Sequence, residues 1–167
     1  MSMSPGNHFY DDKISALAEY LKDGTLEYFH DVLLEEDGLV MWVDWREEDD
    51  AIVEYCEEIL QTGELAAEVV DSDDSPVGYD IIITFRGEGH RIEYPGETTS
   101  RDITIITLNE VLQPDFEIRF CVDSDGSDSL AFLPLPAERW AELEKVSGFE
   151  KVNKCFLKVQ QGSTFFG

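Results

Sequence analysis

The chain has 167 residues, of which 37 are Asp or Glu and 12 are Lys or Arg, so its formal net charge is −25. Residues 1–137 carry this charge with 33 acidic and 7 basic side chains, whereas residues 138–167 carry 4 and 5. So acidic a surface repels nucleic-acid backbones and anionic membranes and attracts cationic partners. We therefore expect no nucleic-acid partner and no membrane partner.

The composition indicates a folded domain. A hydrophobic share of 43% is ordinary for globular proteins and too high for a disordered acidic tail. No apolar run reaches the length of about 18 residues that a membrane span needs, and residues 1–8 lack the pattern of a secretory signal. Three distant cysteines in apolar segments, Cys56, Cys121 and Cys155, are typical of reduced, buried thiols. We expect one cytoplasmic domain over residues 1–167, with residues 1–10 as a frayed or disordered end.

Apolar residues at helical spacing predict three helices in the first part of the chain. They cover residues 11–24, 25–38 and 47–60. The aromatic and β-branched run at residues 39–45 predicts a largely buried strand. Its Trp42 and Trp45 are expected in the core, although an interface would suit them equally well.

The middle of the chain has β character. Strands are predicted at residues 65–70, 79–86 and 90–94, with an acidic loop at 71–76 and a hairpin turn at 87–89. In the segment over residues 100–112, the apolar spacing favours a helix, whereas the β-branched residues favour a strand. We predict the helix.

The last part of the chain continues the mixture. Strands at residues 116–122 and 130–133 flank an acidic turn, and Pro136 suits the first turn of a final helix. Trp140, Leu143 and Val146 are predicted to face inward from that helix, and residues 151–159 to add a short element. Together these patterns predict a single α+β domain in which a mainly antiparallel sheet packs with N-terminal and C-terminal helices.

Motifs of catalysis and metal binding are weak in this sequence. In the acidic turn, Gly126 is fourth and Pro134 twelfth counted from Asp123, whereas a calcium-binding EF-hand loop needs Gly sixth and Glu twelfth. Neither Cys-x-x-Cys nor His-Glu-x-x-His occurs, and the three histidines, His8, His30 and His90, suit surface or boundary positions. We expect no metal, no cofactor and no enzymatic activity.

Residues 116–145 carry a family resemblance. The segment Asp123-Ser-Asp-Gly-Ser-Asp-Ser-Leu-Ala-Phe-Leu-Pro-Leu-Pro-Ala-Glu-Arg-Trp-Ala-Glu-Leu-Glu144 resembles the C-terminal half of small acidic immunity proteins. Those proteins are encoded beside bacterial polymorphic or contact-dependent growth inhibition toxins. The resemblance covers about a fifth of the chain and implies a cytosolic, non-catalytic protein that neutralises one cognate toxin.

Acidic clusters at a helix start and in two loops are the predicted contact residues. A rigid acidic domain can occupy the cationic cleft of a nuclease and associate quickly by electrostatic steering. Our leading hypothesis is therefore an immunity-type inhibitor that binds and neutralises a basic cognate toxin of nuclease type. The alternatives are a small hydrolase or metal-dependent enzyme, and an acidic regulatory or DNA-mimic binding domain. The candidate partner-binding residues are Glu47, Glu48, Asp49, Asp50, Asp71, Asp73, Asp74, Asp123, Asp125 and Asp128.

Overall fold

A computed structural model describes residues 7–23, 40–126 and 128–166 of the chain. The helix predicted over residues 25–38 lies outside this range. The elements observed, in chain order, are α1 (Asn7–Asp23), β1 (Met41–Asp44), α3 (Asp49–Leu60), β2 (Leu65–Asp71), β3 (Tyr79–Phe85), β4 (Glu88–Arg91), α4 (Arg101–Leu112), β5 (Phe116–Cys121), the 3₁₀ turn η2 (Val122–Ser124), β6 (Ser129–Pro136), α5 (Ala137–Ser147), α6 (Phe149–Cys155) and β7 (Phe156–Lys158).

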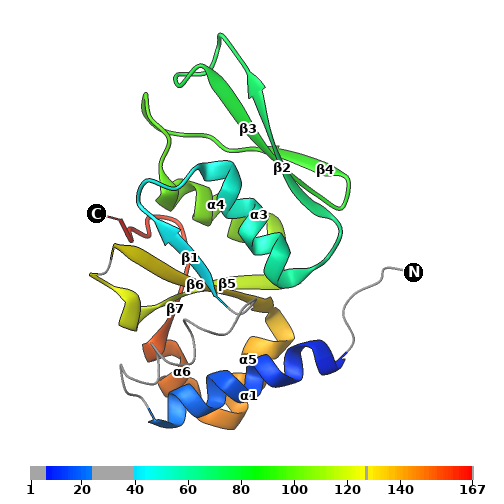
Figure 1. Ribbon diagram of the computed structural model, residues 1–167, viewed down its shortest axis with the longest axis vertical. Helices are drawn as coiled ribbons and strands as arrows, with labels where there is room; N and C mark the ends of the chain where they lie inside the picture. The colour runs from blue at the N-terminus through cyan, green and yellow to red at the C-terminus, as the bar shows by residue number, and fades with distance from the viewer. Residues whose placement is uncertain (1–6, 24–39, 127, 167) are drawn as a thin grey trace.

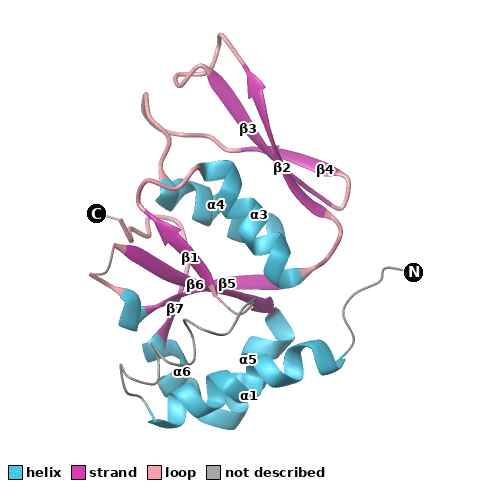
Figure 2. Cartoon of the chain, in the orientation of Figure 1, coloured by secondary structure: helices cyan, strands magenta, loops and turns pink. Residues whose placement is uncertain are grey.

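The strands form two antiparallel sheets. The larger has the order β1-β6-β5-β7, and the smaller has the order β2-β3-β4. Figure 1 shows the small sheet at one end of the molecule, then α3 and α4, then the large sheet, and finally α1, α5 and α6. Figure 2 shows the same alternation of strand and helix layers by colour. The predicted α+β fold, with antiparallel strands packed against N-terminal and C-terminal helices, is confirmed.

Two hydrophobic cores lie on opposite faces of the large sheet. One core joins that sheet to α3, α4 and the small sheet, and the other joins it to α1, α5 and α6. Strand β6 lies between the cores, and residues 130–135 are buried without alternation. Its apolar run follows from this position, because a strand covered on both faces has no polar side.

The helix over residues 101–112 resolves the ambiguity in its sequence. Ser100 accepts a hydrogen bond from Ile103 N at 3.4 Å, which satisfies one free N–H of the first turn. Isoleucines at positions 105 and 106 are buried in the core between the sheets. Capping and tertiary burial outweigh the modest cost of β-branched residues in a helix.

Several local predictions are wrong. Helix α1 begins at Asn7, so residues 7–10 are helical rather than frayed. Tyr10 is buried in the core that α1 shares with α5, α6 and the large sheet. Val146 is 67% exposed, because α5 ends at Ser147 and its last turn projects beyond the core. By contrast, the short element predicted at residues 151–159 is present, as the end of α6 followed by β7. None of the described helices has the length and apolar character needed to cross a membrane.

Candidate acidic binding surface

Strand β1 ends in a turn that exposes Trp45. Asp44 Oδ1 accepts a hydrogen bond from Arg46 N at 2.8 Å, and Asp44 O accepts one from Glu47 N at 2.9 Å. Asp favours such turns because its side chain bonds to the backbone two residues on. Trp45 is 59% exposed, and the Arg46 guanidinium lies 5.4 Å from its ring centroid. The prediction that Trp45 is a core residue is therefore wrong. Alternate residues of β1 are buried, and Trp45 would be the next of them, but the strand ends at Asp44 and the turn directs Trp45 to solvent.

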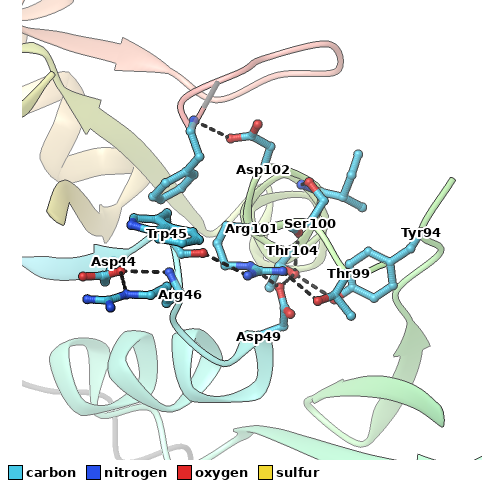
Figure 3. A network of polar contacts seen from close by, with 12 residues as sticks. Asp44, Trp45, Arg46, Asp49, Tyr94, Thr99, Ser100, Arg101, Asp102 and Thr104 are labelled. Carbon is cyan, nitrogen blue, oxygen red and sulfur yellow. Dashed lines mark hydrogen bonds and ion pairs between the residues drawn. The ribbon is translucent and has the colours of Figure 1, made fainter. Parts of the chain in front are cut away.

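Arg101 holds this turn against the start of α4. Its Nη1 donates to Trp45 O at 3.0 Å, its Nε donates to Asp49 Oδ1 at 3.1 Å, and its Nη2 donates to Thr99 Oγ1 at 2.7 Å. Figure 3 shows the guanidinium between these three partners. One planar side chain thus joins the Trp45 turn, α3 and α4 by a fork of hydrogen bonds.

Asp49 belongs to this internal network rather than to the acidic surface. Its side chain is 4% exposed and also accepts a hydrogen bond from the Thr104 hydroxyl. The Tyr94 hydroxyl lies 2.8 Å from Thr104 Oγ1 and extends the network to the segment after β4 (Figure 3). Asp49 was expected to be a solvated contact residue, and its burial corrects that expectation. Its carboxylate instead offsets the charge of Arg101, as a buried ion requires.

The rest of the first acidic cluster surrounds the exposed turn. Glu48 is exposed, Asp50 is half-buried, and Glu47 Oε1 accepts a hydrogen bond from the Tyr55 hydroxyl at 2.9 Å. This contact with Glu47 raises the pKa of Tyr55. The three acids line a hollow of about 350 Å³ whose opposite wall includes Val69 and residues of β3. The hollow therefore combines carboxylates with the guanidinium groups of Arg46 and Arg101 and with the side chains of Val69 and β3.

The third acidic cluster, Asp123, Asp125 and Asp128, directly precedes β6, which pairs with β1. Asp44 pairs with Ser129 in antiparallel register, so Asp128 and Trp45 extend past the same end of the sheet. Asp125 and Asp128 are exposed. Asp123 is exposed as well, but its carboxylate accepts a hydrogen bond from the Tyr20 hydroxyl, which ties it to α1. The strand register thus places Asp128 of the third cluster beside Trp45, next to the first cluster.

The second cluster lies farther away, at the tip of the β2–β3 hairpin. Asp71 pairs with Tyr79 at the end of the ladder, and Asp73 and Asp74 follow in the exposed turn (the upper tip in Figure 1). Asp74 lines a separate hollow with Asp80 and residues of β4. These three acids therefore extend the acidic region without joining the group around Trp45.

We name the group around the turn the Trp45 surface; it consists of Asp44, Trp45, Arg46, Glu47, Glu48, Asp50 and Asp128. The Arg46 backbone N–H, bonded to the Asp44 carboxylate, lowers the pKa of that carboxyl group. At neutral pH the surface presents carboxylates around one large exposed aromatic ring. Sequence reasoning found the acids but missed Trp45 and Arg101, and the Asp at the end of β1 was the available signal for the turn.

Groups that suit catalysis are not assembled in the described part of the chain. Burial raises the pKa of the Cys56 thiol, and it raises that of the Cys121 thiol to about 12, so neither is a nucleophilic thiolate at neutral pH. His90 is partly exposed on β4, with Glu88 3.9 Å away. No three His, Cys, Asp or Glu side chains among the described residues are arranged to hold a metal ion.

Comparison with protein-family models, curated proteins and solved structures returned no match for this chain.

Proposed function

We propose that this protein is an immunity-type inhibitor that binds and neutralises a basic cognate toxin, of nuclease type, through the Trp45 surface. The observation that carries the proposal is the 59% exposure of Trp45 beside the first acidic cluster and Asp128. Large aromatic residues often dominate binding energy when a partner desolvates them. Carboxylates around such a residue select a partner with Lys and Arg side chains.

The clamp by Arg101 supports this role. A recognition loop that is already ordered loses less conformational entropy when a partner binds it. Three hydrogen bonds from one half-buried guanidinium hold the Trp45 backbone, Asp49 and Thr99 together. The net charge of −25 adds long-range attraction for a cationic partner, and this attraction increases the association rate.

The test first asks whether a toxin gene lies directly upstream of the gene for this chain, and then uses the product of that gene as the binding partner. Surface plasmon resonance measures association and dissociation of the full chain between 0.05 and about 0.5 M NaCl, a range over which the Debye length shortens several-fold. We expect the association rate to fall steeply with salt and the dissociation rate to change little. An association rate that does not depend on salt contradicts electrostatic steering.

Two substitutions locate the contact. Trp45→Ala should weaken binding by about 2 kcal/mol, the usual cost of losing a central aromatic contact, chiefly by faster dissociation. Glu48→Lys should slow association, whereas Glu150→Lys makes the same charge change on exposed residue 150 of α6 and should leave inhibition intact. Equal effects of the two charge reversals would show that only net charge matters and would remove the Trp45 surface from the mechanism.

A further inference from the structure

Strand β2 is a long, regular edge strand. All seven of its residues pair with β3, from Leu65 opposite Phe85 to Asp71 opposite Tyr79. Among the described residues no strand pairs with the other side of β2. Its sequence, Leu-Ala-Ala-Glu-Val-Val-Asp, contains neither Pro nor Lys, and its register contains no bulge. Pro, Lys, other charged side chains and bulges are among the devices by which proteins block an open edge, and of these devices β2 carries only the acidic charges of Glu68 and Asp71.

The hydrogen bonds at the two ends of the hairpin show which backbone groups face outward. Glu64 O accepts from Arg86 N at 3.1 Å, and Ser72 N donates to Gly78 O at 3.1 Å. Antiparallel pairing alternates, so the even-numbered residues of β2 bond to β3 and the odd-numbered ones point their N–H and C=O away from it. Those of Ala67, Val69 and Asp71 bond to no other described residue. They form a row of free donors and acceptors.

The side chains along this edge are open to solvent on both faces. Val69 is 48% exposed and the next residue, Val70, is 39% exposed, although their side chains point to opposite faces of the strand. Val69 also lines the hollow beside Asp50 and the Trp45 surface. An added strand would cover both valines and lie next to the surface already assigned to partner binding.

The charge around the edge selects the strand that can be added. Glu68 is exposed on β2, and neither β2 nor α3 contains a Lys or Arg. Asp50 lines the same hollow as Val69 at one end of α3, and Glu57 bonds to Thr62 and Gly63 just before β2 at the other. Arg46 and Arg101 also line that hollow, but their charges are paired with Asp44 and Asp49. Glu54 lies four residues after Asp50 and three before Glu57, so it shares their side of the helix. A second copy of β2 would bring like charges together, whereas a basic strand would not.

We propose that β2 accepts, by strand addition, a segment of the basic partner that carries Lys or Arg at alternate positions. This inference rests on the proposed function for the identity of the partner, and it assigns the part of the partner that is bound. Main-chain hydrogen bonds to Ala67, Val69 and Asp71 supply affinity, and alternate side chains supply selectivity. The partner thus contacts the small sheet and the Trp45 surface together.

The edge is tested directly with a capped nine-residue peptide that alternates Lys and Val, titrated into the ¹⁵N-labelled full chain. We expect amide shifts confined to β2 and its neighbours, and slower hydrogen exchange at Ala67, Val69 and Asp71. The same peptide methylated on every second backbone nitrogen, and the analogue with Glu in place of Lys, should bind at least about tenfold more weakly. Equal binding of the methylated peptide overturns strand addition.

A proline scan separates backbone from side-chain contributions. Val69→Pro removes an outward N–H without breaking the β2–β3 ladder, and Pro is tolerated on edge strands at such positions. Val69→Ala removes the exposed side chain but keeps the N–H. We expect the Pro variant to bind the peptide and the toxin about tenfold more weakly than the Ala variant does. Unchanged amide spectra away from β2 show that the Pro variant is folded.

The outcomes distinguish the two proposals. A toxin that binds wild type and Val69→Pro equally, but loses affinity for Trp45→Ala, overturns the edge inference and leaves the proposed function standing. A toxin that binds neither wild type nor any variant overturns the proposed function and the partner assigned to the edge. A concentration-dependent dimer that Val69→Pro abolishes assigns the edge to a second copy and also overturns the inference.

Discussion

Removing the guanidinium of Arg101 should destabilise the fold much more than removing that of Arg46. The side chains of Arg101 and Asp49 are 16% and 4% exposed, whereas Arg46 is 72% exposed beside Asp44. Breaking a buried ion pair by removing one partner typically costs about 3–5 kcal/mol, because the other charge is left without compensation. Without Arg101, that uncompensated charge would be the carboxylate of Asp49. Exposed pairs contribute about 0–1 kcal/mol.

The expected magnitude for Arg101→Met is near the lower limit of that range, about 3 kcal/mol, because the guanidinium retains some contact with water. In urea unfolding, an m-value of about 2 kcal/mol/M converts this loss into a midpoint lower by about 1.5 M. Arg46→Met is the matched control and should move the midpoint by less than about 0.5 M. Tryptophan fluorescence and far-UV circular dichroism follow the transition at neutral pH.

A double substitution tests the cause. If the loss comes from the uncompensated carboxylate, replacing Asp49 by Leu as well should recover part of the stability lost in Arg101→Met. Arg101→Lys keeps the charge but not the planar fork, so its midpoint should lie between those of wild type and Arg101→Met. A cost for Arg101→Met equal to that of Arg46→Met, or strictly additive single losses, would refute the clamp.

Three further predictions follow from burial and charge. In the native chain, half-buried Cys155 should react with a thiol reagent before Cys56 and Cys121, which are buried; simultaneous reaction of all three would contradict the two cores. Stability should fall between about pH 9 and 12, because burial raises the pKa values of Cys121 and Tyr10 to about 12 and raises that of Cys56 as well. A raised folded-state pKa contributes its full stability below the unfolded-state pKa and loses it as the pH rises to the folded-state pKa. Burial lowers the pKa of Lys13 to about 8, which opposes the fall with one group, so a urea midpoint that rises steadily to pH 11 would refute the assignment. The urea midpoint at pH 7 should rise when NaCl increases from about 0.01 to 0.3 M, because salt screens the repulsion within a chain of net charge −25, and a constant midpoint would show that this repulsion is negligible.

Local sequence patterns predicted the elements of this fold because they report which side of each segment is covered. The apolar run at residues 130–133 predicted a strand, and the structure extends it to β6 and places it between the two cores. The hairpin turn predicted at 87–89 is present but lies at residues 86–87, so β4 begins at Glu88 instead of the predicted residue 90, and Pro136 directly precedes α5. The helix over residues 101–112 was also predictable, since a capping serine precedes its apolar face.

Patterns along the chain carry no information about contacts between distant residues. Arg119 reads as a surface residue, yet it is 2% exposed, with its guanidinium 4.5 Å from the Trp140 ring centroid and 2.9 Å from Glu117. Asp49 looked like its acidic neighbours in sequence until α4 supplied Arg101. Buried charges depend on partners that folding brings from elsewhere, so composition alone misassigns them.

The sequence by itself determined the acidic character of this protein, its α+β class and the positions of its three acidic clusters. Only the tertiary structure decided which clusters meet: strand register brings residues 44 and 129 together, so Asp128 of the third cluster lies beside Trp45 and the first cluster, and the hairpin carries the second cluster away. It also decided that Trp45 is exposed and that one side of β2 is open among the described strands. The physical reason is that charge is a property of each residue, whereas a binding surface is a property of distances between residues, which the pairing of strands and the packing of helices set.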